Sequence, residues 1–204
     1  MIKSLTPIAL AAMIATTAPL HAQETQNSGG ETAAPSADQM LDLGQPVDDG
    51  TPAIGDRYAK ETHGDWDLAC IKTETETDPC SLLQILTAPD GNPMAEVSLF
   101  RIDQAGGQAV AGATVIVPLE TLLPAALTIS VDGAPSKRYN YSFCNPLGCV
   151  AQIGFTQGDI DAFKKGTEAT LSLRPAPAPD QLIELKMSLK GFTAGYNVVD
   201  VVSQ

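Results

Sequence analysis

Apolar and polar residues alternate along a series of short runs in the last two thirds of the chain. The first run covers residues 65–71. Its Trp66, Leu68 and Cys70 share one face, which is the period of a half-buried β-strand. Further runs with a strand-like pattern are 81–87, 95–102, 113–117, 127–131, 138–143 and 150–155. Turns rich in Gly, Pro and Asn separate several of these runs, so the pattern predicts a series of short strands.

The segment 156–166 has the pattern of a short helix. Acidic residues occupy its first turn, and the lysine pair 164–165 occupies its last turn, where positive charge complements the helix dipole. Ile160 and Phe163 fall on one side, and Gly166 supplies a stop. We therefore expect one short helix among the strands.

Beyond the helix, the runs 169–173 and 183–189 alternate again on either side of an Ala-Pro loop at 175–180, which predicts a long hairpin. The segment 192–202 fits neither the helical nor the strand period. Together these patterns predict an all-β fold, an antiparallel β-sandwich with one short helix, preceded by a disordered tether.

The N-terminal residues 1–22 contain the three parts of a secretory signal peptide: a basic start, an apolar run and a small residue at the end. The apolar run is shorter than the roughly 20 residues that a membrane-spanning helix needs, and no transmembrane segment is expected in the mature chain. Residues 23–56 are rich in Gly, Pro, Ser, Thr, Ala and acid, which predicts a disordered acidic linker. The remaining residues, 57–204, predict a single domain.

The four cysteines form two sequence-local couples, Cys70 with Cys80 and Cys144 with Cys149. Sequence allows three pairings, and the turn-like residues inside each couple favour these two disulfides. Neither spacing matches a Cys-x-x-Cys redox motif or a paired zinc knuckle, and export into an oxidising compartment favours structural bridges. Each would contribute about 2 to 3 kcal/mol by the chain-entropy estimate.

The chain is acidic, with a formal net charge of -12. Charge of that sign repels nucleic acid, so no nucleic-acid partner is expected. It also repels anionic lipid surfaces, whereas a basic partner remains compatible with it, and peripheral association with the cell envelope stays open.

Candidate catalytic groups are sparse. After the signal, His63 is the only histidine, and no Gly-x-Ser-x-Gly turn is present. The sequence therefore argues against a serine hydrolase, which needs a nucleophile, a base and an orienting acid. Asp65 and Asp67 share one predicted strand face, but no Asp-rich calcium loop with a closing Glu surrounds them. We expect no catalytic residues, no metal and no cofactor, although paired carboxylates remain an alternative that sequence alone does not remove.

Tyr139, Tyr141 and Phe143 alternate along one predicted strand. Such a strip binds sugars or peptides when it is exposed, and it forms ordinary strand core when it is buried. Tyr139 and Tyr141 are therefore the candidate binding surface.

Four motifs, in their order and spacing, resemble the invasion-associated locus B family over nearly all of the domain. They are GDWDLAC at 64–70, CSLLQ at 80–84, FCNPLGCVA at 143–151 and SLKGF at 188–192. The resemblance implies an exported, sandwich-like β-domain of Gram-negative bacteria, found in the periplasm or at the outer membrane, with no catalytic residues to carry across. One local departure is Ala125-Ala126, where members commonly carry a glycine.

The leading hypothesis is therefore a non-enzymatic protein of the periplasm or outer membrane, or a secreted one, that binds an unidentified protein or cell-envelope component. The alternative is a periplasmic small-ligand or carbohydrate-binding module that uses Tyr139 and Tyr141.

Overall fold

The structure, a computed structural model, describes residues 50–103 and 107–203. The predicted signal peptide at 1–22 and most of the predicted linker, up to residue 49, lie outside the described residues.

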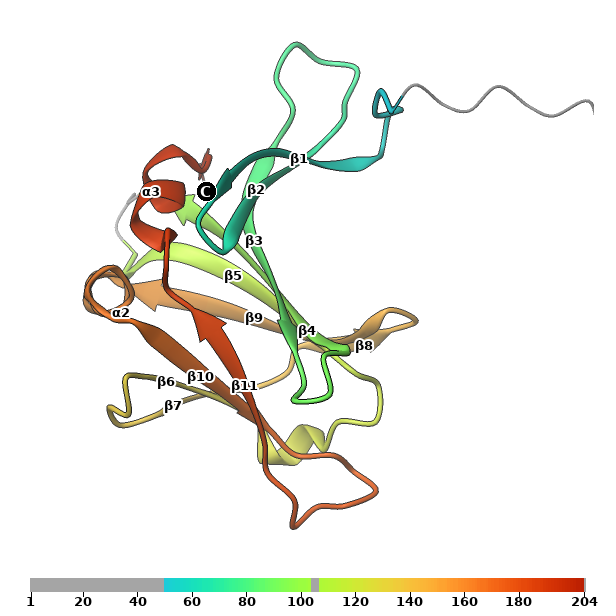
Figure 1. The fold of residues 1–204 in the computed structure, drawn as a ribbon, viewed down its shortest axis with the longest axis vertical. Coiled ribbons are helices and arrows are strands. Elements are labelled where there is room, and N and C mark those ends of the chain that lie inside the picture. Colours follow the sequence, from blue (N-terminus) through green and yellow to red (C-terminus); the bar gives the residue numbers. More distant parts are fainter. Residues whose placement is uncertain (1–49, 104–106, 204) are drawn as a thin grey trace, which may run out of the picture. The chain divides into compact units, whose positions relative to one another are not determined.

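Strands make up about half of the described chain (Figure 1). They are β1 (Arg57–His63), β2 (Trp66–Ile71), β3 (Cys80–Thr87), β4 (Pro93–Ile102), β5 (Ala109–Val117), β6 (Leu127–Val131), β7 (Lys137–Tyr139), β8 (Phe143–Asn145), β9 (Gly148–Thr156), β10 (Glu168–Leu173), β11 (Ile183–Ser188) and β12 (Val201–Val202). The helical elements are a 3-10 turn, η1 (Leu123–Ala125), and the short helices α2 (Gln157–Lys165) and α3 (Phe192–Val198).

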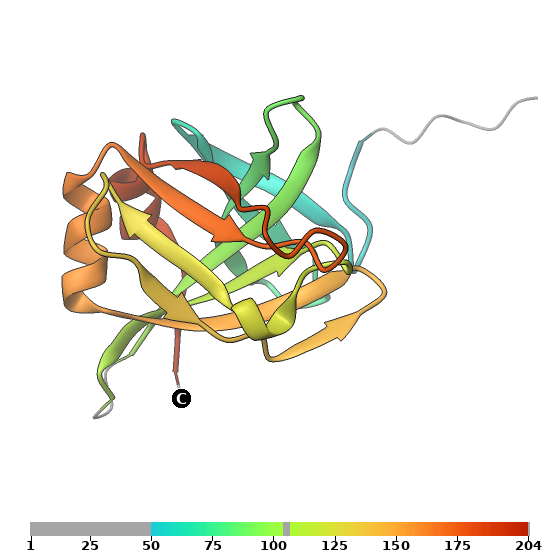
Figure 2. The same ribbon diagram turned by 90° about the horizontal axis from the view of Figure 1, so that it is seen from below.

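The strands form two sheets. An eight-stranded sheet runs in the order β1-β2-β3-β4-β5-β9-β8, with β12 added beside β4, and a four-stranded sheet runs in the order β11-β10-β6-β7. Neighbours are antiparallel except β12, which lies parallel to the end of β4. Figure 2 shows the four-stranded sheet lying across one face of the larger sheet. The architecture is the predicted antiparallel sandwich, and the fold class is confirmed.

The core lies between the sheets and is closed at one end by the two helices (Figure 1). Trp66 of β2 is fully buried and meets Phe192 of α3 edge to face at 5.5 Å between ring centroids. Phe192 in turn meets Phe163 of α2 at 5.4 Å, and Phe163 meets Phe155 of β9 at 5.0 Å. This run of aromatic rings ties both helices to the eight-stranded sheet, because edge-to-face pairs add to simple burial.

Most predicted strands and the predicted helix are found within a few residues of their expected bounds. The helix begins at a capping box, in which Thr156 accepts from the backbone N–H of Asp159 and the Asp159 carboxylate accepts from that of Thr156. The segment 192–202 resolves into α3 and β12, so the domain contains a second short helix beyond the expected one. Strand β1, with the polar sequence RYAKETH, has no alternating apolar pattern that would predict it.

The predicted single strand at 138–143 is wrong. The chain leaves β7 in the smaller sheet at Tyr139 and enters β8 in the larger sheet at Phe143. Alternation cannot distinguish one continuous strand from two short ones that cross between sheets, because the side chains keep the same period.

The turn before β6 contains Ala125-Ala126, where the sequence resemblance leads us to expect a glycine. Ala126 is buried and has φ 60° and ψ 167°, a backbone conformation that glycine adopts far more readily than alanine. The alanine therefore occupies a conformation that suits glycine better.

Candidate functional site

The structure pairs Cys70 with Cys80 and Cys144 with Cys149. Cys70 and Cys80 lie directly opposite each other on β2 and β3, and both are buried. Cys149 is buried at the start of β9, whereas its partner Cys144 on β8 is exposed. The two bridges therefore fasten one hairpin inside the core and one at the sheet edge.

Tyr139 and Tyr141 lie at the crossing between the sheets and are partly buried against the core. The ring of Tyr139 stands edge-on to Phe155 at 6.1 Å, and the buried hydroxyl of Tyr141 has no hydrogen-bond partner among the residues that the structure describes. Burial raises the pKa of both phenols to about 12. Phe143, by contrast, is half exposed, so these aromatic residues do not form one open strip.

A small cavity of about 150 Å³ lies beside Tyr139, between the β6–β7 hairpin and α2. The ion pair between Lys137 and Asp159 borders it. Ligand pockets for small molecules usually enclose about 300 to 1,000 Å³. The cavity is smaller than that range, so it suits a single side chain or a few atoms better than a sugar ring.

The acidic residues that sequence singled out are used in local contacts. Asp65 Oδ2 accepts from Ser188 Oγ at 2.6 Å, and Asp67 Oδ1 accepts from Thr62 Oγ1 at 2.8 Å. His63 Nε2 lies 3.2 Å from Glu61 Oε2. Among residues 50–103 and 107–203, no three His, Cys, Asp or Glu side chains come together as metal ligands would.

A polar hollow of about 590 Å³ lies near the Cys70–Cys80 bridge, and Asp78 and Asp200 border it. Hydrogen bonds from the Thr73 backbone, from Tyr58 and from Lys72 lower the pKa of Asp78 well below its usual range. Asp200 Oδ2 accepts from the backbone N–H of Cys80 at 2.6 Å. Both carboxylates fasten loops or strand ends, and the lowered pKa of Asp78 is opposite to the raised pKa that a general acid needs.

The larger candidate site lies on the outer face of the eight-stranded sheet, the face turned away from the four-stranded sheet. Ile85 of β3, Glu96 of β4 and Ile116 of β5 lie opposite one another in the strand register. The row continues through Val150 of β9 to Phe143 of β8. A mostly apolar line of side chains therefore crosses the sheet on its solvent side.

A hollow of about 750 Å³ is centred on this row, and we call it the outer hollow. Its apolar lining includes Ile71, Ile85, Met94, Ile116 and Leu147, and its charged lining residues are Arg57 and Glu96. Ile85 is 45% exposed and Leu147 is 81% exposed. Covering large aliphatic side chains that are this exposed lowers the free energy, and a group of them on one surface is typical of an interaction site.

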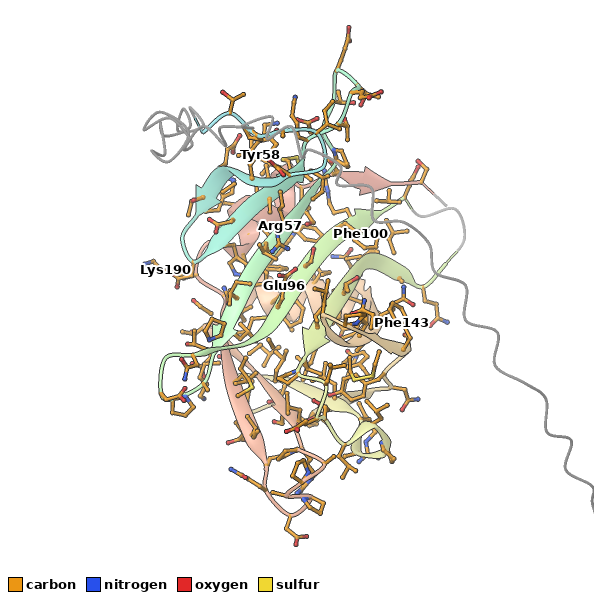
Figure 3. The ribbon with its side chains drawn as sticks, turned by 90° about the vertical axis from the view of Figure 1, so that its right-hand side faces the viewer. Arg57, Tyr58, Glu96, Phe100, Phe143 and Lys190 are labelled. Atoms are coloured by element: carbon orange, nitrogen blue, oxygen red, sulfur yellow. A yellow bond between two sulfur atoms is a disulfide. The ribbon has the colours of Figure 1, made fainter. Side chains whose placement is uncertain are left out.

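The two charges in the outer hollow neutralise each other. Arg57 donates from Nη1 to Glu96 Oε1 at 2.6 Å and from Nη2 to Glu96 Oε2 at 3.0 Å, and this bidentate hydrogen bonding raises the pKa of Arg57. Figure 3 shows the two side chains meeting over the strands, with Phe143 farther along the same face. The outer hollow is thus a neutral surface on an acidic chain.

Leu147 stands at the tip of the β8–β9 turn and is held there by several contacts. Its backbone N–H donates to Asn145 Oδ1 at 2.9 Å, and the Cys144–Cys149 bridge closes the turn at its base. Gly148 has φ 152°, and a Cβ at that position would collide with the backbone oxygen of Val117 on β5. The turn is therefore pressed onto the sheet, and it presents Leu147 at the rim of the outer hollow.

The outer hollow was not predicted from sequence, although β3 carries a signal for it. Along CSLLQILT, the inward positions include Leu82 and Leu86, but the outward positions include Leu83 and Ile85. A strand that is apolar on both faces indicates a second covered surface. When each strand is read only for alternation, the apolar residues at the outward positions of β3 are not recognised as a second surface.

Among the described residues, no helix is both long and apolar enough to cross a bilayer. Comparison with known proteins gives a match to the family model described as invasion associated locus B (IalB) protein, over residues 66–200. The chain belongs to the IalB family. Residues 66–200 run from β2 to just past the end of α3 and include both disulfides and the lining of the outer hollow except Arg57 of β1.

Two curated IalB-like proteins and one solved structure agree with this assignment. The invasion protein B homologues of Brucella abortus strain 2308 and of Brucella abortus biovar 1 strain 9-941 are each 26% identical to this chain over 146 residues, which is 71% of this chain and 81% of each relative. The crystal structure of invasion associated protein b from Bartonella henselae matches with a TM-score of 0.56 at 24% identity, covering 67% of this chain and 91% of that chain. That structural likeness establishes the fold. Two disulfides in an IalB scaffold fit an extracytoplasmic protein, because thiols in the cytosol are kept reduced.

Proposed function

We propose that this IalB-family chain is a non-enzymatic, exported and envelope-associated binding protein, and that the outer face of its eight-stranded sheet is the contact surface. The observation that carries the proposal is the outer hollow, where exposed Ile85 and Leu147 surround a charge-neutral centre. Interfaces are marked by well-packed apolar cores with few uncompensated charges.

The rigidity of this face supports binding. β3, β4 and β5 pair antiparallel under the hollow, with one register shift between Leu86 and Thr87, and the Cys144–Cys149 bridge fixes its rim. A preformed surface loses little conformational entropy when a partner arrives. Within the described part of the chain, the residues that line the hollow include no nucleophile and no histidine, which also favours binding over catalysis.

Export completes the proposal. Residues 1–22 would act as a cleaved signal peptide and residues 23–56 as an acidic linker ahead of the domain at 57–204. The mature protein would reside in the periplasm, at the outer membrane or outside the cell, without nucleic acid, metal or cofactor.

Capture from envelope extract tests this proposal. The immobilised full chain should retain a specific envelope component, and Ile85→Asn should reduce that capture at least tenfold. Leu182→Asn, which changes a similarly exposed side chain in the β10–β11 loop away from the outer hollow, is the matched control and should capture as the unmodified chain does. Equal capture by all three chains, or none by any, would contradict the proposal.

A small-ligand or carbohydrate site at Tyr139 and Tyr141 is the second proposal. The buried hydroxyl of Tyr141 without a partner favours it, because such a group gains from a ligand that completes its hydrogen bond. The partial burial of both rings and the small adjoining cavity make it the weaker of the two. Tyr141→Phe should abolish sugar binding if the proposal holds and leave envelope capture unchanged.

A further inference from the structure

The outer hollow and its rim contain both halves of a self-complementary contact. Leu147 is an apolar knob, 81% exposed, and the hollow beside it is a socket of about 750 Å³. We infer that this hollow binds a second copy of the same chain. In that dimer, Leu147 of each copy lies in the hollow of the other. The inference rests on the proposed function and names one occupant of the same surface.

A twofold axis makes such an arrangement closed. In an isologous pair, each contact between residue i and residue j occurs twice, so one knob beside one socket is enough to build a symmetric dimer. Leu147 itself belongs to the lining of the hollow, so the knob and the socket lie on one face, as a twofold contact requires. In the inferred dimer both contacts form together and leave neither Leu147 nor the hollow free for a third copy. Closed twofold dimers are the commonest soluble oligomers.

The rigidity of the knob supports this role. The Cys144–Cys149 bridge, the hydrogen bond from Leu147 N–H to Asn145 Oδ1 and the close packing of Gly148 on β5 hold the turn before any partner arrives. Interface anchors that are already fixed lose less entropy on binding than mobile side chains. Leu147 can therefore act as an interface anchor. A residue of the same exposure in a mobile loop would lose more entropy on binding and would anchor the contact less well.

Electrostatics selects this face for contact between copies. The chain carries a net charge of -12, so two copies repel each other overall. In the outer hollow the charges are Arg57 and Glu96, which already neutralise each other within one copy. Two outer faces can therefore meet with little Coulomb cost, and a cationic partner has no net charge to recognise there.

Sedimentation of the full chain tests the inference. Between about 1 and 100 µM, the weight-average mass should rise from one chain toward two. Leu147→Asp should keep the chain monomeric over the whole range, because dimerisation would bury two uncompensated carboxylates. Leu182→Asp, an exposed leucine remote from the hollow, should dimerise as the unmodified chain does. A chain that stays monomeric throughout, or a Leu147→Asp variant that still dimerises, overturns the inference.

Photo-crosslinking locates the contact. With p-benzoylphenylalanine in place of Leu147, irradiation should give a covalent dimer whose crosslinked peptide comes from β3 or β5, around Ile85 or Ile116. A dimer crosslinked elsewhere overturns the inference. Circular dichroism and the urea midpoint confirm that each variant is folded before either experiment is read.

The experiments distinguish failure of the inferred dimer from failure of the proposed envelope-binding function. A monomeric chain that still captures an envelope component through Ile85 removes the dimer and keeps the proposed function. A Leu147-dependent dimer that captures nothing from the envelope keeps the dimer and removes the proposed function.

Discussion

The carboxamide of Gln84 forms two hydrogen bonds with the backbone of Ser188. Its oxygen accepts from the Ser188 N–H at 2.9 Å, and its nitrogen donates to the Ser188 carbonyl at 3.0 Å. Gln84 lies on β3 of the larger sheet and Ser188 ends β11 of the smaller one, so a side chain replaces the backbone ladder where the two sheets meet. Trp66 Nε1 donates to the same carbonyl at 2.8 Å, which places the junction next to the core.

Replacing Gln84 should therefore weaken the domain. Gln84→Leu leaves the partly buried N–H of Ser188 without the Gln84 oxygen as its partner, and we expect a loss of about 1 to 3 kcal/mol in the free energy of unfolding. Urea denaturation measures the change. Gln152→Leu, an exposed glutamine on β9 of the same sheet, is the matched control and should stay within about 0.5 kcal/mol of the unmodified chain. A Gln84→Leu midpoint equal to that of the control would show that the junction contributes no stability.

The two disulfides should differ in their resistance to reduction of the folded protein. Thiol–disulfide exchange requires access to a sulfur, and Cys144 is exposed whereas Cys70 and Cys80 are buried. Mild dithiothreitol without denaturant should reduce Cys144–Cys149 first. Alkylation followed by peptide mapping reads the order, and early labelling of Cys70 would refute it. Replacing both Cys144 and Cys149 by serine should cost about 2 kcal/mol.

Stability should fall in acid partly through Asp78. Hydrogen bonds from the Thr73 backbone, Tyr58 and Lys72 lower the pKa of Asp78 in the folded chain. A carboxyl whose pKa is lowered by folding stabilises the protein above its unfolded pKa of about 3.9, and that stability is lost as the pH falls below this value.

The urea midpoints at pH 7 and pH 3 test the role of Asp78. The drop between them should be smaller for Asp78→Asn than for the unmodified chain, because the amide does not titrate. Asp180→Asn, in the exposed β10–β11 loop, should show the full drop. Equal drops for all three would remove Asp78 from the acid response.

Ala126 should tolerate glycine and reject a branched side chain. At φ 60°, ψ 167°, valine adds the cost of a β-branched residue in a strained conformation, so Ala126→Val should destabilise the domain by about 2 kcal/mol or more. Ala126→Gly relieves the backbone strain but removes a buried methyl group. Because these effects oppose each other, the free energy of unfolding should stay within about 1 kcal/mol of that of the unmodified chain. Thermal unfolding compares the two, and an equally stable valine variant would contradict the backbone conformation.

The tyrosines should titrate late. Burial raises the pKa of Tyr139 and Tyr141 to about 12, so little phenolate should form near pH 10 in the folded protein. Because folding favours the neutral phenol, this contribution to stability is present below pH 10 and is lost as the pH rises toward 12. Absorbance at 295 nm follows the titration, and Tyr141→Phe should remove part of the late component. Normal titration of both tyrosines would instead indicate an open aromatic strip.

The strand at Leu127–Val131 and helix α2 were predictable in detail because their signals are local. The alternation of Leu127 and Ile129, the capping residue Thr156 and the stop at Gly166 act within a few residues of each other. The pairing of each cysteine couple was favoured for the same reason, since short loops bring their ends together at little entropic cost. The family motifs likewise lie in short contiguous segments.

Strand β1, the crossing between β7 and β8, and the outer hollow depended on tertiary structure. The polar strand β1 forms because β2 offers it a free edge, and Tyr139 and Phe143 belong to different sheets because the chain crosses between them after β7. The same holds for the candidate site: Ile85, Ile116 and Leu147 are distant in sequence and meet only through strand pairing. The sequence by itself determined the family, the alternating strands, α2 and the favoured cysteine couples, because these follow from short-range patterns. The two-sided apolar pattern of β3 indicates only that a second apolar surface exists. The pairing of β3, β4 and β5, which joins segments distant in sequence, decided which side chains meet there.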